Sequence, residues 1–557
     1  MTRMRLITSD ARRDLWLFFG LALLLIGAGL GLRDPWPADE PRFVLVAKQM
    51  VESGRWLFPM RGDELYPDKP PLFMWLQAMS YLLTGSWRLG FLLPSLLSAL
   101  GTLWLVQDLG RRLWNRRVGL IAGYALLFAL QFTYQAKKAQ IDPTITFLIT
   151  LSVYGLLRHL LCGPDRRMLL LGFFAAGLGV ITKGVGAVAL LMFLPAALAR
   201  ARQWPGVQRT DTGVFLLGMG VFLFAIALWL VPMLLAVSSS DDPALRAYAD
   251  NILLRQTAQR YGSSWHHHQP PWYFLSVIAT MWLPAALALP WALPAWWRRL
   301  RRRDPRYLLL LGWVVAVAVF FSIPSGKRDV YLLPALPMFC LALAPLLPGL
   351  LRRRGPRWLM LGFVLLLAVL GLVGGALPLL GEPGFETRLE AARGLDPHAD
   401  GLWWLLLGIG LCAALAAAWG RLRHATAALL LSLSAVWLLF GFVAYPLLDE
   451  SSSARGLMRS VGERIGPAAE LALVAWKEQN LLQADRPART FGFRRAPAEQ
   501  LRDAIRWQAE APPTRWVLVL EEAMGDCILR QHAQHAGRAN RRDWWLFRAD
   551  AVEPACR

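Results

Sequence analysis

Several kinds of motif are missing from this sequence of 557 residues. It has no Walker loop for a nucleotide phosphate, no G-x-G-x-x-G after a strand, no C-x-x-C pair and no internal repeat of fixed period. The sequence therefore gives no support for a nucleotide-driven enzyme, a dinucleotide-binding fold, a thiol redox protein or a solenoid.

Acidic residues are scarce. The chain has 38 Asp and Glu against 60 Lys and Arg, which gives a formal net charge of +22. In a soluble protein such an excess suggests nucleic acid as a partner. Here the arginines form short clusters between apolar runs, for example at 111–117 and 298–303. Arginine in short loops marks the cytoplasmic side of a membrane protein, so we expect contact with membrane lipids and no binding of nucleic acid.

Apolar runs dominate what is present. Hydrophobic residues make up 56% of the chain, more than the roughly 45–50% of soluble domains, and the mean hydropathy is +0.39. Many runs are long enough to cross a hydrocarbon core about 30 Å thick. The first, at 15–32, has no small-residue cleavage site and is followed by many others. It is therefore predicted to be a retained span and not a signal peptide.

The order of the runs predicts a polytopic α-helical membrane domain over 1–447, with about thirteen transmembrane helices and outer loops at 34–87 and 237–270. With the N-terminus in the cytoplasm, every arginine cluster falls inside and every unusual polar motif outside. Residues 71–84 are predicted to form an interfacial helix. The tail, 448–557, alternates short apolar runs with amphipathic stretches, which predicts a small periplasmic α/β domain. The predicted spans are 14–33, 88–109, 117–134, 143–161, 168–181, 185–200, 213–236, 271–297, 307–323, 330–350, 358–380, 402–419 and 426–447.

Cysteine is rare, with five in the whole chain. Two of them, Cys527 and Cys556, lie in the tail. If the tail is outside the cytoplasm, the compartment permits a disulfide between them, and the sequence leaves that question open.

Charged and polar residues gather in the loops that are predicted to lie outside. Taken singly, each has an ordinary explanation, such as a solvated carboxylate, a helix N-cap or a snorkelling lysine. Taken together, they predict an outer cavity that combines carboxylates with cations. The set comprises Asp39, Glu40, Arg42, Tyr66, Asp68, Lys69, Asp142, Lys183, Arg255, Arg260, Lys327, Arg328 and Tyr331.

Such a cavity suits a lipid-linked phosphate substrate. Cations hold a phosphate and stabilise it as a leaving group, while a carboxylate orients or activates an acceptor. Because no nucleotide is available outside the cell membrane, a transfer reaction there needs a donor that is already activated. A membrane-borne sugar phosphate meets this need.

A run of three histidines at 266–268 raises the question of a metal. Imidazole and carboxylate are usual zinc ligands, but consecutive histidines cannot all face one ion. A zinc site would therefore use Asp68 with His266 and His268. The alternative is a polar aromatic belt at the membrane interface. The predicted chemistry requires no cofactor.

Six motifs, in this order, resemble the membrane glycosyltransferases of the aminoarabinose transferase type, which are related to the protein O-mannosyltransferases and have the GT-C fold. The resemblance covers roughly residues 1–340. An acidic pair after the first span, followed about thirty residues later by KPPL, is specific for the superfamily more than for the sugar or acceptor. The motifs are WPADEPR, YPDKPPLFMWLQA, IDPTITFLIT, ITKG, HHHQPPWYF and GKRDVYLLPALP.

The resemblance implies an inverting transfer of a sugar, 4-amino-4-deoxy-L-arabinose in this family, from undecaprenyl phosphate to lipid A at the periplasmic face of the inner membrane. By motif position, Asp39 looks like the catalytic carboxylate and Asp142 like the second acid of the cavity, and Glu40 is counted with them as a catalytic residue. Asp68 stands where relatives often have Glu, which keeps the charge but shortens the reach. The expected donor-phosphate ligands are Arg42, Lys69, Arg260, Tyr331 and Lys183, and the expected cavity residues are Tyr66, Asp68, Arg255, Lys327 and Arg328.

Three other functions fit parts of the sequence. The nearest keeps the superfamily but changes the acceptor to a protein hydroxyl or another envelope glycan, for which Asp39 must act as a general base. A flippase would bind the phosphate without chemistry, but no pair of broken spans marks an inverted-repeat transporter. A non-catalytic scaffold would not need the cavity charges.

Overall fold

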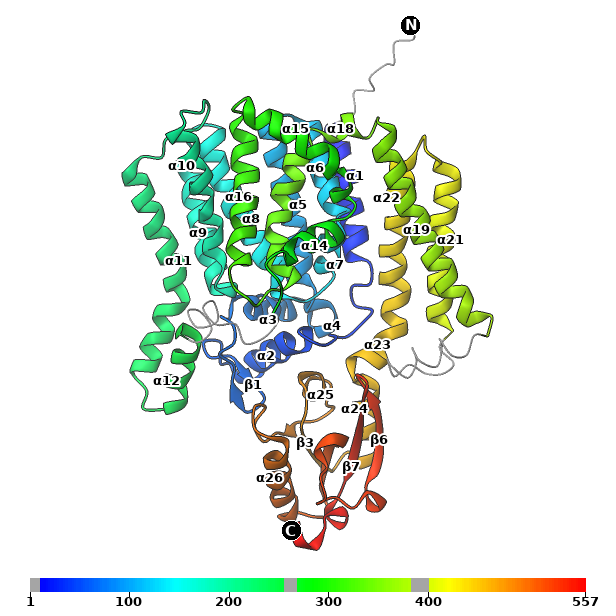
Figure 1. Ribbon diagram of the computed structural model, residues 1–557. Helices are drawn as coiled ribbons and strands as arrows, with labels where there is room; N and C mark the ends of the chain where they lie inside the picture. The colour runs from blue at the N-terminus through cyan, green and yellow to red at the C-terminus, as the bar shows by residue number, and fades with distance from the viewer. Residues whose placement is uncertain (1–10, 255–267, 382–399, 557) are drawn as a thin grey trace.

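The computed structural model describes residues 11–254, 268–381 and 400–556. Upright helices form a bundle, and a smaller α/β unit hangs below one end of it, joined through α23 (Tyr445–Ser453) and α24 (Arg455–Ile465) (Figure 1). We call residues 455–556 the C-terminal domain. Helix α1 (Ala11–Gly27) begins at the opposite end of the bundle (Figure 1).

Seven continuous helical stretches in the described residues are long and apolar enough to cross a membrane, and two bent pairs raise the number to nine. The protein is therefore a multi-pass helical membrane protein by length and composition. The seven are α4–α5 (Trp87–Gly90 and Leu93–Leu113), α8 (Ile141–Leu161), α11 (Thr212–Ser238), α16 (Pro305–Ser322), α19 (Arg354–Leu379), α21 (Gly401–Gly420) and α22–η5–α23 (Ala425–Leu439, the π-helix Phe440–Ala444, and α23). The bent pairs are α6–α7 (Arg116–Leu127 and Leu130–Ala136) and α14 with η3–α15 (Tyr273–Met281, then Ala285–Ala288 and Leu289–Arg301).

The other four expected spans are helical as well, in shorter pieces or with charged ends. The total of thirteen crossings therefore stays a prediction. These elements are α1, α9 (Arg166–Lys183), η1–α10 (Gly186–Met192 and Phe193–Ala201) and η4–α17–α18 (Asp329–Ala335, Leu336–Leu343 and Leu347–Leu350).

Two expected straight spans are bent. The segment predicted at 117–134 turns by 70° between α6 and α7, and the segment predicted at 271–297 turns by 101° between α14 and η3–α15. The bends meet, since the Leu130 N–H donates to the Leu283 carbonyl at 2.8 Å. Buried Gln131 joins them further by accepting from the Trp282 indole at 2.9 Å. Backbone groups freed at each bend thus find partners inside the protein, as a membrane interior requires.

Small residues bring some helices very close. A Cβ added at Gly371 of α19 would lie 2.6 Å from the Cα of Gly410 on α21, nearer than real contacts allow. Backbone approach of this kind is typical of helix pairs in membranes, where van der Waals packing replaces the hydrophobic effect as the driving force.

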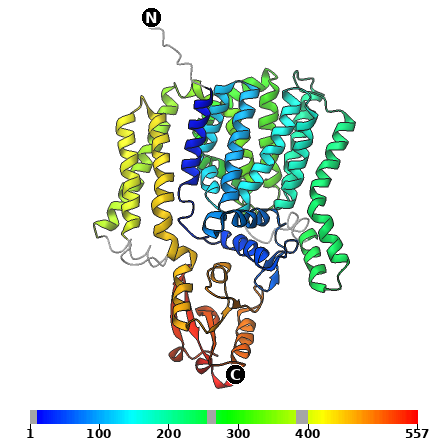
Figure 2. The ribbon, with the colours of Figure 1, turned by 180° about the vertical axis from the view of Figure 1, so that it is seen from behind.

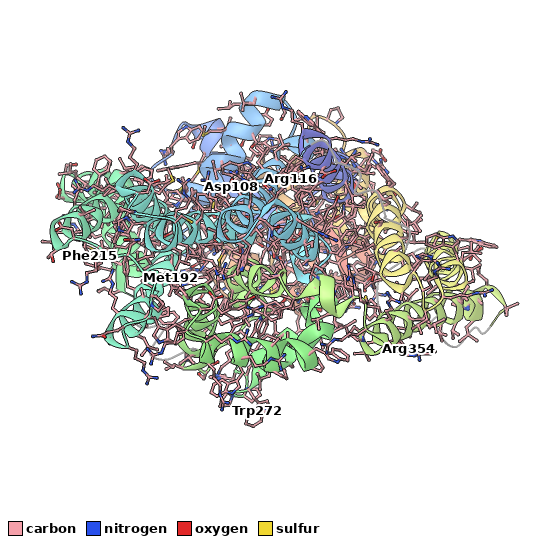
Figure 3. All side chains as sticks on the ribbon, turned by 90° about the horizontal axis from the view of Figure 1, so that it is seen from above. Asp108, Arg116, Met192, Phe215, Trp272 and Arg354 are labelled. Atoms are coloured by element: carbon pink, nitrogen blue, oxygen red, sulfur yellow. A yellow bond between two sulfur atoms is a disulfide. The ribbon has the colours of Figure 1, made fainter. Side chains whose placement is uncertain are left out.

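The end of the bundle remote from the C-terminal domain carries arginines from several loops and helix ends, among them Arg116 and Arg354 (Figure 3). There Asp108 of α5 accepts hydrogen bonds from Arg111 at 2.6 Å and from Arg112 at 2.5 Å. Asp14 accepts from Arg116 at 2.6 Å. The few carboxylates at this end are therefore used to anchor arginines.

The C-terminal domain contains a five-stranded sheet in the order β4-β3-β5-β7-β6. Strand β3 is parallel to β4 and β5, while β7 is antiparallel to β5 and β6. Helices and strands thus alternate in this part of the chain, and the helix before it continues to Ser453, past the expected boundary at 447. The elements are β3 (Glu470–Val474), α25 (Glu478–Leu482), β4 (Ala488–Arg489), α26 (Pro497–Ala509), β5 (Arg515–Leu520), β6 (Gln534–Ala539), β7 (Arg542–Phe547) and the short helices η6 (Glu521–Ala523), η7 (Arg530–His532), η8 (Ala549–Ala551) and η9 (Pro554–Cys556).

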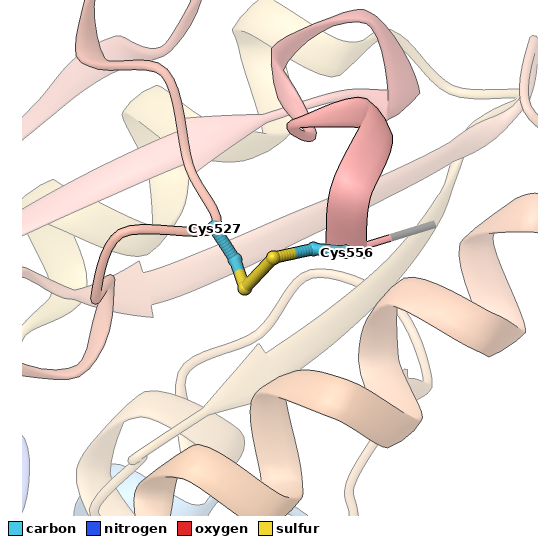
Figure 4. Close-up of a disulfide and its surroundings, with 2 residues drawn as sticks. All are labelled: Cys527 and Cys556. Carbon is cyan, nitrogen blue, oxygen red and sulfur yellow. A yellow bond between two sulfur atoms is a disulfide. The ribbon is translucent and has the colours of Figure 1, made fainter.

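Cys527 and Cys556 form the disulfide that the sequence left open (Figure 4). It ties the chain end to the loop after η6 across 29 residues. Closing a loop of that length stabilises a domain by about 3 kcal/mol, chiefly by restricting the unfolded chain.

Replacing both cysteines by serine is expected to lower the free energy of unfolding of the C-terminal domain by about 3 kcal/mol. Urea unfolding, monitored by limited proteolysis, measures this change. Wild-type protein with its disulfide reduced should unfold at the same urea concentration as the double variant. An unchanged urea midpoint in the double variant would contradict the assigned disulfide between Cys527 and Cys556.

Candidate active site

Two helices lie across the base of the bundle, between it and the C-terminal domain (Figure 2). Helix α3 (Leu72–Thr84) is the helix expected at 71–84, whereas α2 (Glu40–Ser53) occupies part of the expected loop. Pro41 in the first turn and Gly54 after the last, at φ 69°, define the ends of α2. The buried face of α2 packs on α3 and on Tyr66, through Phe43, Val46, Ala47 and Met50.

Asp39 stands at the head of α2, with its carboxylate shared among three side chains. Its oxygens lie 3.5 Å from Arg42 Nη1, 3.3 Å from Arg328 Nη2 and 3.3 Å from Gln140 Nε2. The side chain is 18% exposed and makes no capping bond to its own helix. It is therefore a partly accessible carboxylate held between two guanidinium groups.

Glu40, its neighbour, is buried and fully occupied. Arg33 donates to both of its oxygens, at 2.5 and 2.7 Å. The backbone N–H groups of Trp36 and Ala139 also donate to it, each at 2.8 Å. Glu40 thus pins the loop after α1 to the segment before α8.

Asp142 and Lys183 form the next pair of the site. Asp142 lies in the first turn of α8, and the Lys183 ammonium at the end of α9 donates to it. The same ammonium lies 5.3 Å from the ring centroid of Tyr331 in η4. Burial opposes the charge on Arg328, but Asp39 and Asp142 more than offset this and hold the pKa of Arg328 above its usual value.

The C-terminal domain reaches this site through Glu478. Its carboxylate accepts from Arg42 Nε at 2.9 Å and lies 3.5 Å from Arg61 Nη1. Arg61 belongs to a hairpin formed by β1 (Met60–Arg61) and β2 (Glu64–Leu65). Asp68, just after the hairpin, accepts from Arg494 of the domain at 2.6 Å.

Tyr66 and Lys69 lie beside this hairpin. Tyr66 is buried, and burial raises the pKa of its hydroxyl although the charge of Arg42 opposes the shift. Lys69 is half-buried in the turn that leads into α3. Tyr66 stands next to Arg61, whose guanidinium carbon lies 5.2 Å from its ring centroid.

Some predicted residues are placed elsewhere or lie outside the described residues. Lys327 is buried and donates to the Gln269 carbonyl at 3.1 Å, so it fastens its loop to the segment before α14. His268 is exposed and pairs in a single β-bridge with Gly326. In the part of the chain that the structure describes, no three His, Cys, Asp or Glu residues cluster as metal ligands would. Arg255, Arg260 and His266 lie outside the described residues.

Three site residues were not expected from the sequence. Gln140 directly precedes the motif IDPTITFLIT, and its amide donates to Asp39. Arg61 could have been suspected, since it begins the charged stretch RGDELYPDK, which also holds Lys69. Glu478 has no local signal, because its partners lie in a distant part of the chain.

The resulting site places acids beside cations at the end of the bundle that faces the C-terminal domain. Asp39 and Asp142 are flanked by Arg42, Arg328 and Lys183. Such a site can bind an anionic group through the cations, with carboxylates directly beside it.

Known proteins match both the sequence and the fold. The family model described as dolichyl-phosphate-mannose-protein mannosyltransferase matches residues 68–231. An undecaprenyl phosphate-α-4-amino-4-deoxy-L-arabinose arabinosyl transferase of Pseudomonas fluorescens is 34% identical over 402 residues, which cover 70% of this chain and 68% of the relative. The chain belongs to the aminoarabinose transferase family. A second member, from Pectobacterium carotovorum, is 32% identical over 63% of each chain.

A solved aminoarabinose transferase shares the fold. The crystal structure of ArnT from Cupriavidus metallidurans bound to undecaprenyl phosphate superposes with a TM-score of 0.72, covers 98% of this chain and 100% of its own, and is 19% identical. The same protein in the apo state gives the same TM-score. This confirms the expected helical GT-C type of architecture for the aminoarabinose transferase described here.

Proposed function

We propose that this protein is an inverting glycosyltransferase that moves 4-amino-4-deoxy-L-arabinose from undecaprenyl phosphate to a phosphate of lipid A. The printed names of its relatives state that sugar and that lipid carrier. The observation that supports the reaction best is the carboxylate of Asp39, which lies between Arg42 and Arg328 at the edge of the bundle.

The cations would bind the phosphate that leaves. In the transfer, an oxygen of the acceptor forms a bond to the anomeric carbon, and the bond from that carbon to the donor's phosphate oxygen breaks. The electron pair goes to undecaprenyl phosphate, whose negative charge grows. Arg42, Lys69, Lys183 and Arg328 supply positive charge for this stage, with Tyr331 lying against Lys183.

Asp39 would orient the acceptor and hold the arginines in place. A phosphate acceptor is already ionised, so it needs little help to lose a proton. Asp142, paired with Lys183, would take the same part on the opposite side of the site. Glu40 would act on the position of Asp39, because its own oxygens are occupied by Arg33 and two backbone groups.

We place the site on the periplasmic face of the bacterial inner membrane. The arginine-rich end of the bundle would then face the cytoplasm, following the positive-inside rule. The C-terminal domain and its disulfide would lie in the oxidising periplasm.

We propose that transfer needs no resident metal, because the cations at Asp39 and Asp142 can offset the phosphate charge. Dialysis of the purified enzyme against EDTA is expected to leave the rate of transfer unchanged. A loss of activity that zinc restores would contradict this. It would point instead to the candidate ligand set of Asp68, His266 and His268.

Another acceptor, a protein hydroxyl or an envelope glycan, is the main alternative. A hydroxyl must lose its proton, so Asp39 would then act as a general base and activity would fall as the carboxylate is protonated. Activity that persists at lower pH with lipid A, but not with hydroxyl acceptors, favours the phosphate.

Mass spectrometry of lipid A tests the proposal directly. The host lacks its own transferase and expresses either this chain or its Asp39→Asn variant. A pentosamine increment with the intact chain alone supports sugar, acceptor and carboxylate together. If the donor is present and the protein is in the membrane, an absent increment would assign the enzyme to another sugar or acceptor.

A further inference from the structure

Glu478 is a buried carboxylate that belongs to the C-terminal domain but faces the site in the membrane part. Its side chain is 5% exposed. Oε1 alone contacts both Arg42, at 2.9 Å, and Arg61, at 3.5 Å. The backbone that presents it is fixed, since the Lys477 N–H donates to Asn480 Oδ1 at 3.0 Å.

The two guanidinium groups share few other anions. Arg42 also contacts Asp39, at the longer distance of 3.5 Å. Arg61 also faces Asp68, at 3.8 Å, and its guanidinium lies 3.8 Å from the ring centroid of Phe493 in the domain. Burial lowers the pKa of Arg61 although Glu478 opposes the shift. Two arginines therefore depend on one well-placed carboxylate.

A carboxylate in this position resembles a phosphate in chemistry. Guanidinium groups bind carboxylate and phosphate oxygens with the same planar, charge-assisted hydrogen bonds. If Arg42 binds the donor phosphate, as the proposed function has it, Glu478 holds the place that a phosphate oxygen would take on Arg42.

We propose that Glu478 is a displaceable ligand of Arg42 and Arg61, which the phosphate of the lipid donor replaces and which returns to help release the product. This positioning role rests on the proposed function. The donor is a phosphodiester with one negative charge. The product, undecaprenyl phosphate, is a monoester with up to two and therefore holds the arginines more tightly. A competing carboxylate shortens the life of that product complex.

Docking of the domain does not depend on Glu478 alone. Asp63 of the hairpin accepts from Thr490 Oγ1 at 2.9 Å and from the Gly492 N–H at 3.2 Å. Asp68 and Arg494 form a further pair at 2.6 Å. A Glu478→Gln variant keeps the size of the side chain and these contacts, so the domain should stay in place.

The experiment measures the binding of undecaprenyl phosphate to full-length protein in detergent micelles. Glu478→Gln is expected to bind it roughly tenfold more tightly, a modest value for coupled charge pairs. In steady-state transfer, both KM for the donor and kcat should fall, because undecaprenyl phosphate is released more slowly. Glu470→Gln is the matched control, because it removes an exposed carboxylate of the same domain that pairs with Arg515.

Equal or weaker binding of undecaprenyl phosphate by folded Glu478→Gln would overturn the inference. If that variant does not fold, Glu478→Asp keeps the charge at shorter reach, and its affinity should exceed that of wild type. No gain with Glu478→Asp overturns the inference as well. A wild-type protein that fails to bind undecaprenyl phosphate instead overturns the proposed donor, and this inference with it.

Discussion

Asp39→Asn is expected to give a folded, membrane-inserted protein whose transfer rate is about 10²-fold lower, the scale on which misplaced reacting groups lose rate. Asparagine keeps the shape of the side chain, but its single Oδ1 can accept from only one of the two arginines, because Arg42 and Arg328 contact different oxygens of Asp39. It removes the negative charge that stands between the two guanidinium groups. The acceptor then loses its orienting anion, and the arginines are left with an excess of positive charge.

Initial rates with purified enzyme and lipid A measure this effect, and lipid A mass spectrometry confirms it in cells. The matched control is Glu52→Gln, because Glu52 lies on the same helix, is 60% exposed and contacts Lys48 only at 3.8 Å. The control should keep the wild-type rate. Full activity in Asp39→Asn would remove the carboxylate from the mechanism.

Substitution of Glu40, next to Asp39, should mainly reduce the stability of the protein. Glu40→Ala is expected to lower the free energy of unfolding by about 3–5 kcal/mol, the usual cost of removing one partner from a buried ion pair. Arg33 would remain buried, at 2% exposure, without its carboxylate. The N–H groups of Trp36 and Ala139 would lose their acceptor.

Thermal unfolding in detergent measures this loss of stability, and the accumulation of the variant in membranes should fall with it. Glu52→Ala on the same helix should shift the midpoint only slightly. A stable Glu40→Ala protein without activity would show instead that Glu40 takes part in the chemistry. These two experiments thus separate the roles of Asp39, expected in the transfer reaction, and Glu40, expected in the stability of the fold.

Much of the helical framework follows from local sequence. The segment expected at 143–161 is α8, Ile141–Leu161, because the length of an apolar run depends on nearby residues alone. The grouping of site residues was predicted by counting membrane crossings along the chain. Asp39, Asp142 and Lys183 lie on every second connection between predicted spans, which are the connections on one side of the membrane, and the structure brings them together.

Other features depend on contacts that no local pattern reveals. Helix α2 mixes Glu, Arg and Lys with its apolar residues, so its sequence looks like a loop. The bend near Ala129 depends on two hydrogen bonds to residues more than 150 positions later: the Leu130 N–H donates to Leu283, and Gln131 accepts from Trp282. Glu478 reaches Arg42 across 436 residues. These features needed the three-dimensional structure.

The separation of 436 residues between Arg42 and Glu478 also sets the order in which the parts of the site are synthesised. A ribosome adding about 5–20 residues per second needs roughly 20–90 s to travel from Arg42 to Glu478. Throughout that time the arginines of α2 and the hairpin are already at the membrane surface without their partner from the last domain. A chain truncated before Glu478 would therefore insert its helices and still lack a finished site, so the site is completed only after the membrane helices have been made.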